Sequence, residues 1–218
     1  MGCTRPSRGG LALTPSPLPS LLALALAAIT ACSAPSGEMP STGAPDVGSR
    51  SSQLTRAPAR PPDVRFEPSP PEVVDAMLRL AAVGPDDVVF DLGCGDGRIV
   101  IAAVAELGAR RGVCVEIDPA LVARARHAAR RAGVEERIDF VEGDLFAADL
   151  SDATVVALFL FPDVNLRLRP RLLGQLAPGT RVVSHEHDMG DWRPEKVVEV
   201  GGHRIYLWTI PPRDEPPP

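Results

Sequence analysis

Hydrophobic residues between about positions 66 and 210 follow two alternating patterns. Short continuous apolar runs are separated by longer segments in which apolar residues recur every three or four positions. The short runs are typical of buried parallel strands, and the longer segments are typical of amphipathic helices. This alternation of strand and helix predicts an α/β fold built on a largely parallel sheet.

The pattern predicts five strands, the helices between them and a terminal hairpin. Strands are expected at 88–91, 112–118, 138–141, 153–160 and 180–184, and helices at 70–81, at 99–107, at 120–132 and up to about 176. Pro170 lies inside the last helix and predicts a kink or a restart there. Two strand-like runs at 196–200 and 203–210 flank Gly201-Gly202 and predict a hairpin.

Several signals mark the start of the first helix. Ser69 is expected to cap it, Pro70 suits the first helical position, and Glu72 completes a capping box. An apolar stripe is then expected to face the core: Val73, Val74, Met77, Leu78 and Ala81. Gly84-Pro85 ends this helix before the first strand.

Residues 1–32 are interpreted as a signal peptide. Arg5 and Arg8 precede an apolar stretch at 18–29, which is too short for a comfortable transmembrane helix. The Ala-Cys pair that ends the segment resembles a bacterial lipobox. This resemblance predicts cleavage before Cys32 and lipidation of its sulfur. Ordinary signal cleavage nearby, or an uncleaved anchor, is the alternative.

Composition divides the remainder of the chain into three parts. Residues 33–62 are rich in Ser, Pro, Gly, Thr and Ala without an apolar period, which predicts a disordered tether. Residues 63–211 contain the predicted elements and form the expected folded domain. Residues 212–218 are polar and proline-rich, and we expect a flexible tail there.

Charge and cysteine content narrow the candidate functions. The 218 residues carry a formal net charge of −5, so no basic excess indicates a nucleic-acid partner. Cys94 and Cys114 fall within predicted core elements, and no metal-binding spacing or disulfide framework is recognisable. The two cysteines could lie on neighbouring strand ends, but a bridge between them is not favoured. No resident metal is expected.

The clearest chemical signal is the stretch that joins the first strand to the second helix. Asp91 ends the strand, and Gly93, Gly95 and Gly97 follow in the spacing G-x-G-x-G. Glycines permit a sharp turn and a close approach of a ligand to the backbone, and the following helix offers unpaired N–H groups. The spacing differs from the G-x-G-x-x-G of dinucleotide sites, and a carboxylate suits a cation better than a pyrophosphate.

Two further acids follow the next two strands. Glu116 ends the second strand about twenty residues beyond the glycines, where an acid can accept hydrogen bonds from a ribose diol. Asp144 follows the third strand and could meet an adenine amino group, with Leu145 supplying a backbone N–H beside the ring. Because the carboxyl ends of parallel strands meet at one edge, these acids are expected to share a ligand site.

The Asp-x-Gly-x-Gly-x-Gly stretch resembles motif I of the class I S-adenosylmethionine-dependent methyltransferases. The resemblance covers about 66–210 and implies a seven-stranded Rossmann-like α/β sheet with helices on both faces and a C-terminal antiparallel hairpin. It also implies S-adenosyl-L-methionine as the cofactor. The implied cofactor-binding residues are Asp91, Gly93, Gly95, Gly97, Glu116, Asp144 and Leu145.

A narrower resemblance rests on the Pro-Ser-Pro-Pro-Glu, Asp-Leu-Gly-Cys-Gly-Asp-Gly-Arg-Ile-Val, Phe-Leu-Phe-Pro-Asp-Val and Arg-Val-Val-Ser stretches. These stretches are similar to the mitochondrial lysine methyltransferases of the adenine nucleotide translocase and the ATP synthase c-subunit, and to their bacterial relatives. The resemblance implies N-methylation of a protein lysine by direct in-line transfer. A small-molecule methyltransferase is one alternative. A non-catalytic envelope lipoprotein that binds a nucleoside-like ligand or a partner is another.

Substrate contacts are expected near the end of the fourth strand. Phe66, Phe161, Pro162 and Asn165 are the candidate substrate-binding residues. An apolar channel for the acceptor is the hypothesis, with walls supplied by Phe66, Phe159, Phe161 and Trp192. The Asn/Asp-Pro-Pro-Tyr/Phe motif of nucleic-acid and glutamine methyltransferases is missing from this position. His185 and His187 are expected to share a strand face, and the pattern identifies no catalytic base.

Localisation is expected at the cell envelope of a bacterium, either lipid-anchored or periplasmic. The membrane would be contacted only through the lipid on Cys32. S-adenosylmethionine is made in the cytoplasm, so a cytoplasmic location is the alternative if the N-terminal segment is not an active signal. The pattern does not define an oligomeric state.

Overall fold

The computed structural model describes residues 61 and 65–213. The expected signal peptide, the lipidation of Cys32, nearly all of the tether and most of the tail lie outside the described residues. In the part of the chain that the structure describes, no helix is both long enough and apolar enough to span a membrane.

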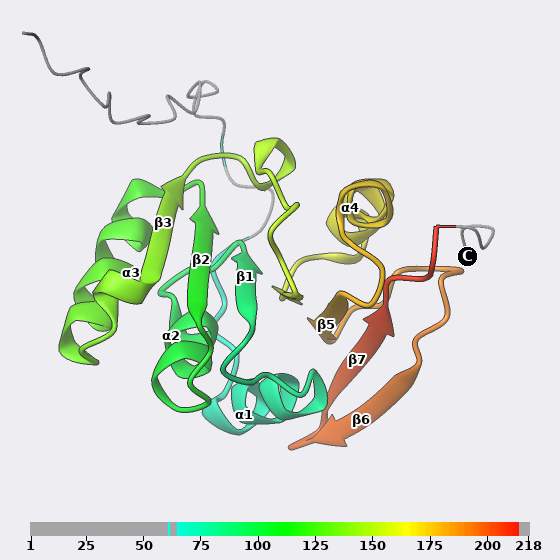
Figure 1. Ribbon diagram of the computed structural model, residues 1–218, viewed down its shortest axis with the longest axis horizontal. Helices are drawn as coiled ribbons and strands as arrows, with labels where there is room; N and C mark the ends of the chain where they lie inside the picture. Colours follow the sequence, from blue (N-terminus) through cyan, green and yellow to red (C-terminus); the bar gives the residue numbers. More distant parts are fainter. Residues whose placement is uncertain (1–60, 62–64, 214–218) are drawn as a thin grey trace, which may run out of the picture. The chain divides into compact units, whose positions relative to one another are not determined.

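The folded part is built on a seven-stranded sheet with the order β3-β2-β1-β4-β5-β7-β6 (Figure 1). The strands are β1 (Val88–Leu92), β2 (Arg111–Glu116), β3 (Ile138–Glu142), β4 (Val155–Leu158), β5 (Arg181–His185), β6 (Lys196–Val200) and β7 (His203–Thr209). The first five strands are parallel, and β7 pairs antiparallel with both β5 and β6. The predicted seven-stranded class I architecture is confirmed.

Helices cover both faces of the sheet (Figure 1). The helices are α1 (Pro71–Leu80), α2 (Arg98–Ala105), α3 (Pro119–Arg131) and α4 (Pro162–Gln175), with short 3-10 turns at Glu135–Arg137 and Leu145–Ala147. The first three pack into one hydrophobic cluster and α4 into another. The helix α4 continues through Pro170, so the restart expected at that residue is wrong.

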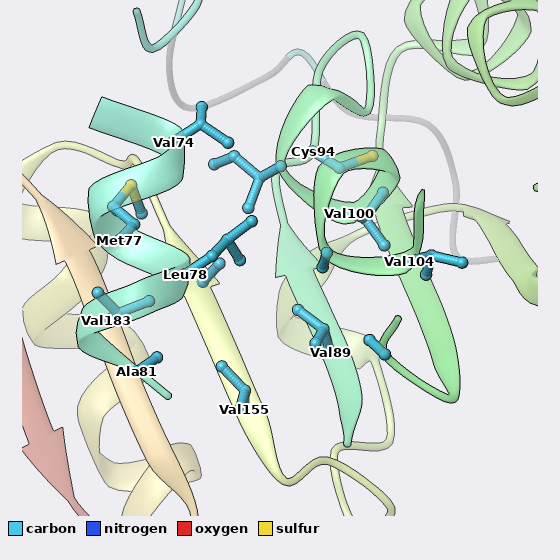
Figure 2. Close-up of a cluster of buried hydrophobic side chains, with 14 of the residues drawn as sticks. Val74, Met77, Leu78, Ala81, Val89, Cys94, Val100, Val104, Val155 and Val183 are labelled. Carbon is cyan, nitrogen blue, oxygen red and sulfur yellow. The ribbon is translucent and has the colours of Figure 1, made fainter. Parts of the chain in front are cut away.

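The apolar stripe of α1 packs against the middle of the sheet (Figure 2). Met77 and Ala81 are fully buried, and they belong to the same cluster as Val89, Val155 and Val183. Burying a side chain of the size of Met77 contributes roughly 1.5–3 kcal/mol. The predicted stripe is confirmed, and this packing fixes the position of the segment that precedes α1.

The start of α1 differs from the sequence prediction. The helix begins at Pro71, Pro70 occupies the N-cap position, and no side chain caps the helix. The Ser69 hydroxyl instead lies 2.9 Å from Nδ1 of His185, which is 116 residues further along the chain. The capping box was wrong because a buried long-range partner competes with the local N–H groups for this hydroxyl.

The C-terminal hairpin is confirmed. Gly201 and Gly202 join β6 to β7 with φ values of 60° and 84°, and two successive positive φ values match the right-handed twist of paired strands. Trp208 of β7 donates its indole N–H to the carbonyl oxygen of Trp192 at 2.8 Å. Trp192 is therefore part of the core on the α4 face and does not line the cavity described below.

Candidate cofactor and acceptor site

The glycine loop between β1 and α2 requires glycine for conformation and for space. Gly93, Gly95 and Gly97 all have positive φ values. A Cβ on Gly95 would lie 2.4 Å from the Phe66 ring, and a Cβ on Gly97 would lie 2.9 Å from Cβ of Ala125 in α3. Any side chain at Gly95 would therefore displace the segment that precedes α1.

A cavity of about 290 Å³ opens at the carboxyl ends of β1, β2 and β4 and beside the loop after β3. Of the candidate residues, those that line it are Phe66, Asp91, Gly93, Gly95, Glu116, Asp144 and Leu145. Gly97 does not line it, because this glycine is the N-cap of α2 and packs on α3. The three acids that were predicted at one edge of the sheet, Asp91, Glu116 and Asp144, thus line one cavity.

Asp91 is the most unusual group in the cavity. Its side chain is 2% exposed, and its Oδ2 has no hydrogen-bond partner among the described residues. Burial, followed by the charge of Glu116, raises the pKa of Asp91 to about 8, although a hydrogen bond with the backbone of Val100 acts in the opposite direction. A buried acceptor without a donor is costly, and a cationic ligand group would satisfy it.

Glu116 fixes the glycine loop to the end of β2. Its Oε2 accepts a hydrogen bond from the N–H of Gly95 at 2.9 Å, and its Oε1 accepts from the N–H groups of Ile117 at 2.8 Å and Asp118 at 2.9 Å. Each carboxylate oxygen has two lone pairs, so Oε2 keeps capacity for a ligand hydroxyl. Glu116 therefore shapes the loop in addition to facing the cavity.

Two further acids of the cavity lining, Asp144 and Asp118, cap the helices that follow them. Asp144 accepts from the N–H of Phe146 at 2.9 Å and so orients Leu145. Asp118 accepts from the N–H of Ala120 at 2.8 Å, which confirms it as the N-cap of α3, and it also lines the cavity. Local capping therefore positions the backbone on this side of the cavity.

The opposite side of the cavity is apolar. Phe159 and Leu160 follow β4, and Val164 comes from the first turn of α4. Phe161 is 45% exposed and, like Pro162, lies outside the cavity lining. Of the four expected substrate-binding residues, the structure places only Phe66 in the cavity wall.

Asn165 has contacts that differ from those expected. It is fully buried, and its Nδ2 donates to Oγ of Ser184 at 3.3 Å and to the carbonyl oxygen of His187 at 3.2 Å. These contacts join α4 to the loop after β5. No local pattern in the sequence marks these long-range contacts of Asn165.

The segment at 65–69 forms a wall of the cavity, and only Phe66 of this segment was predicted from the sequence. Arg98 holds it, since Nη1 of Arg98 donates to the carbonyl oxygen of Ser69 at 2.8 Å. Arg98 also forms an ion pair with Asp96 at 2.7 Å, and Arg124 lies 3.6 Å from the same carboxylate. A chain of polar contacts therefore connects this wall to the glycine loop.

The two histidines expected to share a strand face do not do so. Glu186 has a φ of 64°, which ends the strand alternation after His185. His185 is 1% exposed and its ring centroid lies 3.9 Å from that of Phe159, whereas His187 lies near Phe161 at 6.3 Å between ring centroids. Burial, and then the neighbouring His203, lowers the pKa of His185 to about 4.

The structure joins Cys94 and Cys114 in a disulfide. The register of β1 and β2 pairs Asp91 with Cys114, and the loop returns Cys94 to within 5.4 Å between the two Cα atoms. The sequence analysis disfavoured this bridge, and that expectation was wrong. The twenty-residue spacing carries no local signal, since only the strand register brings the two thiols together.

Comparison with known proteins identifies the family. The model of the ANTKMT methyltransferase domain matches residues 91–196. A protein-lysine N-methyltransferase of Saccharolobus islandicus is 43% identical over 153 residues, which are 68% of this chain and 95% of that enzyme. The chain belongs to this methyltransferase family.

Two further relatives extend the comparison. The mouse adenine nucleotide translocase lysine N-methyltransferase is 37% identical over 63% of this chain, and the chain spans 59% of the mouse enzyme. The crystal structure of an RNA methyltransferase from Salinibacter ruber, in complex with S-adenosyl-L-homocysteine, is 56% identical. It covers 69% of this chain and 97% of its own, with a TM-score of 0.67.

The protein is therefore an S-adenosylmethionine-dependent methyltransferase, and the cavity fits that cofactor. The unpartnered oxygen of Asp91 suits the cofactor's ammonium group, and the remaining capacity of Glu116 suits the ribose hydroxyls. Gly93 and Gly95 bring main chain into the lining of the cavity.

Proposed function

We propose that this methyltransferase acts on the side-chain nitrogen of lysine in a protein. The observation that carries the proposal is its similarity to a protein-lysine N-methyltransferase over 95% of that enzyme's length. A second relative, from mouse, is also named for lysine methylation. The apolar side of the cavity supports the same acceptor, for the chemical reason given below.

Roles for the cofactor-binding residues follow from their positions. Asp91 would bind the ammonium group, Glu116 the ribose hydroxyls, and the Asp144-Leu145 backbone and side chains the adenine ring. Gly93 and Gly95 would let the ligand approach the main chain. Bound S-adenosylmethionine supplies an electrophilic methyl group on a sulfonium.

The acceptor side favours an uncharged amine. A lysine ammonium has no lone pair for attack, and apolar surroundings favour its neutral form. Phe66, Phe159 and Leu160 provide such surroundings. The proposed reaction is a direct in-line displacement, in which these walls hold the amine at attack distance and exclude water, without a covalent enzyme intermediate. Phe161, which directly follows Leu160 and is 45% exposed, is proposed to contact the protein acceptor outside the cavity.

RNA is the competing acceptor, because the structure from Salinibacter ruber is described as an RNA methyltransferase. The formal charge of −5 argues against strong binding to a polyanion. The decisive experiment incubates the full chain with methyl-tritiated S-adenosylmethionine and a bacterial extract. The extract is then divided into protein, RNA and small-molecule fractions, and labelled protein is hydrolysed for amino-acid analysis.

The proposal requires label in protein as methylated lysine. Asp91→Asn should abolish the label, and Asp163→Asn, an exposed aspartate of α4 outside the cavity lining, is the matched control that should retain it. Label in RNA or in small molecules would instead assign a different acceptor. Label in no fraction would contradict the proposal.

We also propose that the protein is exported and lipidated at Cys32. The composition of residues 1–32 supports export, and so does the Cys94–Cys114 disulfide, because disulfides are rare in reducing compartments. Activity there requires cofactor outside the cytoplasm. Fractionation of cells with and without globomycin tests the proposal. Accumulation of an uncleaved precursor under the inhibitor supports it, and an unprocessed chain in the cytoplasm of untreated cells contradicts it.

A further inference from the structure

A second polar cluster lies at the end of β5 and the start of β7, outside the lining of the cofactor cavity. Nε2 of His185 lies 3.1 Å from Nδ1 of His203. The same Nδ1 lies 2.7 Å from Oε1 of Glu186, and that oxygen lies 3.8 Å from Nε2 of His185. Three atoms with lone pairs therefore converge on one small volume.

Hydrogen bonds within the cluster cannot serve both contacts of His203 fully. Nδ1 of His203 carries either one hydrogen or one lone pair. If it carries the hydrogen, then that single hydrogen must be shared between Glu186 and the lone pair on Nε2 of His185. If it keeps the lone pair and accepts from His185, then it faces the lone pairs of the Glu186 carboxylate. A cation between the three atoms would satisfy all of them.

The separations match those around a tetrahedral zinc ion. Ligands about 2.0–2.1 Å from zinc in this geometry lie about 3.3 Å from one another. The three observed separations of 2.7, 3.1 and 3.8 Å lie on both sides of this value. Two imidazoles and a carboxylate are also ligand types that zinc accepts.

Neighbouring groups hold the ligands as zinc sites require. The Ser69 hydroxyl lies 2.9 Å from Nδ1 of His185, which fixes the ring so that Nε2 faces the cluster. Phe159 packs against the same ring. Glu186 holds a φ of 64°, a conformation that non-glycine residues rarely adopt and that turns it back toward His203.

We propose that His185, Glu186 and His203 bind one zinc ion, with the fourth coordination position open to a water molecule. The side chains of Glu186 and His203 are 32% and 36% exposed, so an ion can reach the site from solvent. The ion would join β5 to β7 and, through Ser69, support the wall of the cofactor cavity.

The test is zinc binding by the full chain, measured by competition with a chromophoric chelator after treatment with EDTA. We expect one zinc per chain. His203→Ala should weaken binding by about 100-fold or more, and the conservative Glu186→Gln should also weaken it. Ser69→Ala, which removes only the support of His185, should weaken it by about tenfold. Cobalt(II) should give the strong visible absorption of a four-coordinate ion.

His187→Ala is the matched control, because His187 neighbours the cluster without belonging to it. It should bind zinc as the native chain does. Failure of the native chain to bind zinc or cobalt overturns the proposal. Binding that survives both His203→Ala and Glu186→Gln also overturns it, since the ion would then sit elsewhere, for example on Cys3 or Cys32. These readouts do not depend on methyl transfer.

Discussion

Two buried aspartates lie near opposite ends of β1, and their polar atoms are satisfied very differently. Asp87, just before the strand, accepts from the Thr154 hydroxyl at 2.7 Å and from the N–H of Gly84 at 2.8 Å, and it pairs with Arg181. Asp91, inside the strand near its carboxyl end, has an oxygen without a hydrogen-bond partner among the described residues, and its pKa is raised to about 8.

The comparison shows how burial alone fails to identify function. Both carboxylates are less than a tenth exposed. Asp87 connects β1 to β4 and β5 at the amino end of the sheet, and its surroundings already supply its donors and a cation. At the edge where ligands of such sheets bind, Asp91 forms no ion pair with any residue that the structure describes. The unsatisfied carboxylate is therefore the one that we assign to the cofactor.

The largest expected effect is a loss of cofactor affinity, which should follow substitution of Asp91 but not of Asp87. Asp91→Asn should weaken S-adenosylmethionine binding by about 1,000-fold, which corresponds to about 4 kcal/mol, because it removes one partner of a buried charge pair. Asp87→Asn, in protein kept folded at low temperature, should bind the cofactor normally. Calorimetric titration measures both. Native affinity in Asp91→Asn would refute the assignment of this carboxylate.

The second prediction concerns the Cys94–Cys114 disulfide, which joins the glycine loop after Asp91 to β2. Replacing both Cys94 and Cys114 by alanine should reduce the free energy of unfolding by about 3 kcal/mol, because the bridge closes a loop of about twenty residues. The melting temperature should fall by roughly 6–12 °C. Reducing agent should lower the melting temperature of the native protein and leave the double variant unchanged. A reductant-insensitive native protein would exclude the bridge.

The third prediction concerns the satisfied aspartate. Asp87→Asn should cost about 1–3 kcal/mol of stability, because Arg181 loses its charge partner and the single amide oxygen cannot accept from both Thr154 and Gly84 as the two carboxylate oxygens do. Arg181 keeps its hydrogen bonds to the carbonyl oxygens of Ala81 and Ala82, which limits the loss. Denaturant unfolding of the cofactor-free protein measures the effect. If Asp87→Asn is as stable as the native chain, the contrast between the two sites is lost.

The last prediction is a slope against pH, and it comes from Asp91 in the cofactor-free protein. The folded state holds this proton until pH about 8, whereas the unfolded chain releases it near 3.8. Its stabilising contribution is therefore complete below about pH 4 and is lost as the pH rises to about 8, with a slope of at most about 1.4 kcal/mol per unit.

Asp91→Asn removes that slope and serves as the reference. The difference in stability between this variant and the native chain should change in favour of the variant between pH 4 and 8, then stay constant at higher pH. Unfolding in urea across this range checks the prediction. A difference that is independent of pH would mean that Asp91 is ionised in the free protein.

Local patterns in the sequence determined the order of the helices and strands and the acidic side of the site. Apolar runs and helical periodicity placed the five parallel strands, the helices between them and the hairpin at Gly201-Gly202. The sequence alone predicted that the acids at the ends of β1 and β2 and the acid after β3 share one site. The physical reason is general, since parallel strands bring their carboxyl ends to one edge of a sheet.

Only the tertiary structure decided the pairs that join distant segments. Ser69 meets His185 across 116 residues, although its local sequence favours a helix cap. Likewise, His203 in β7 meets His185 because β7 lies between β5 and β6. Strand order and register set these contacts, and no local periodicity encodes either of them. The sequence by itself therefore determined the cofactor edge, and the packing of distant strands decided the disulfide, the acceptor wall and the histidine cluster.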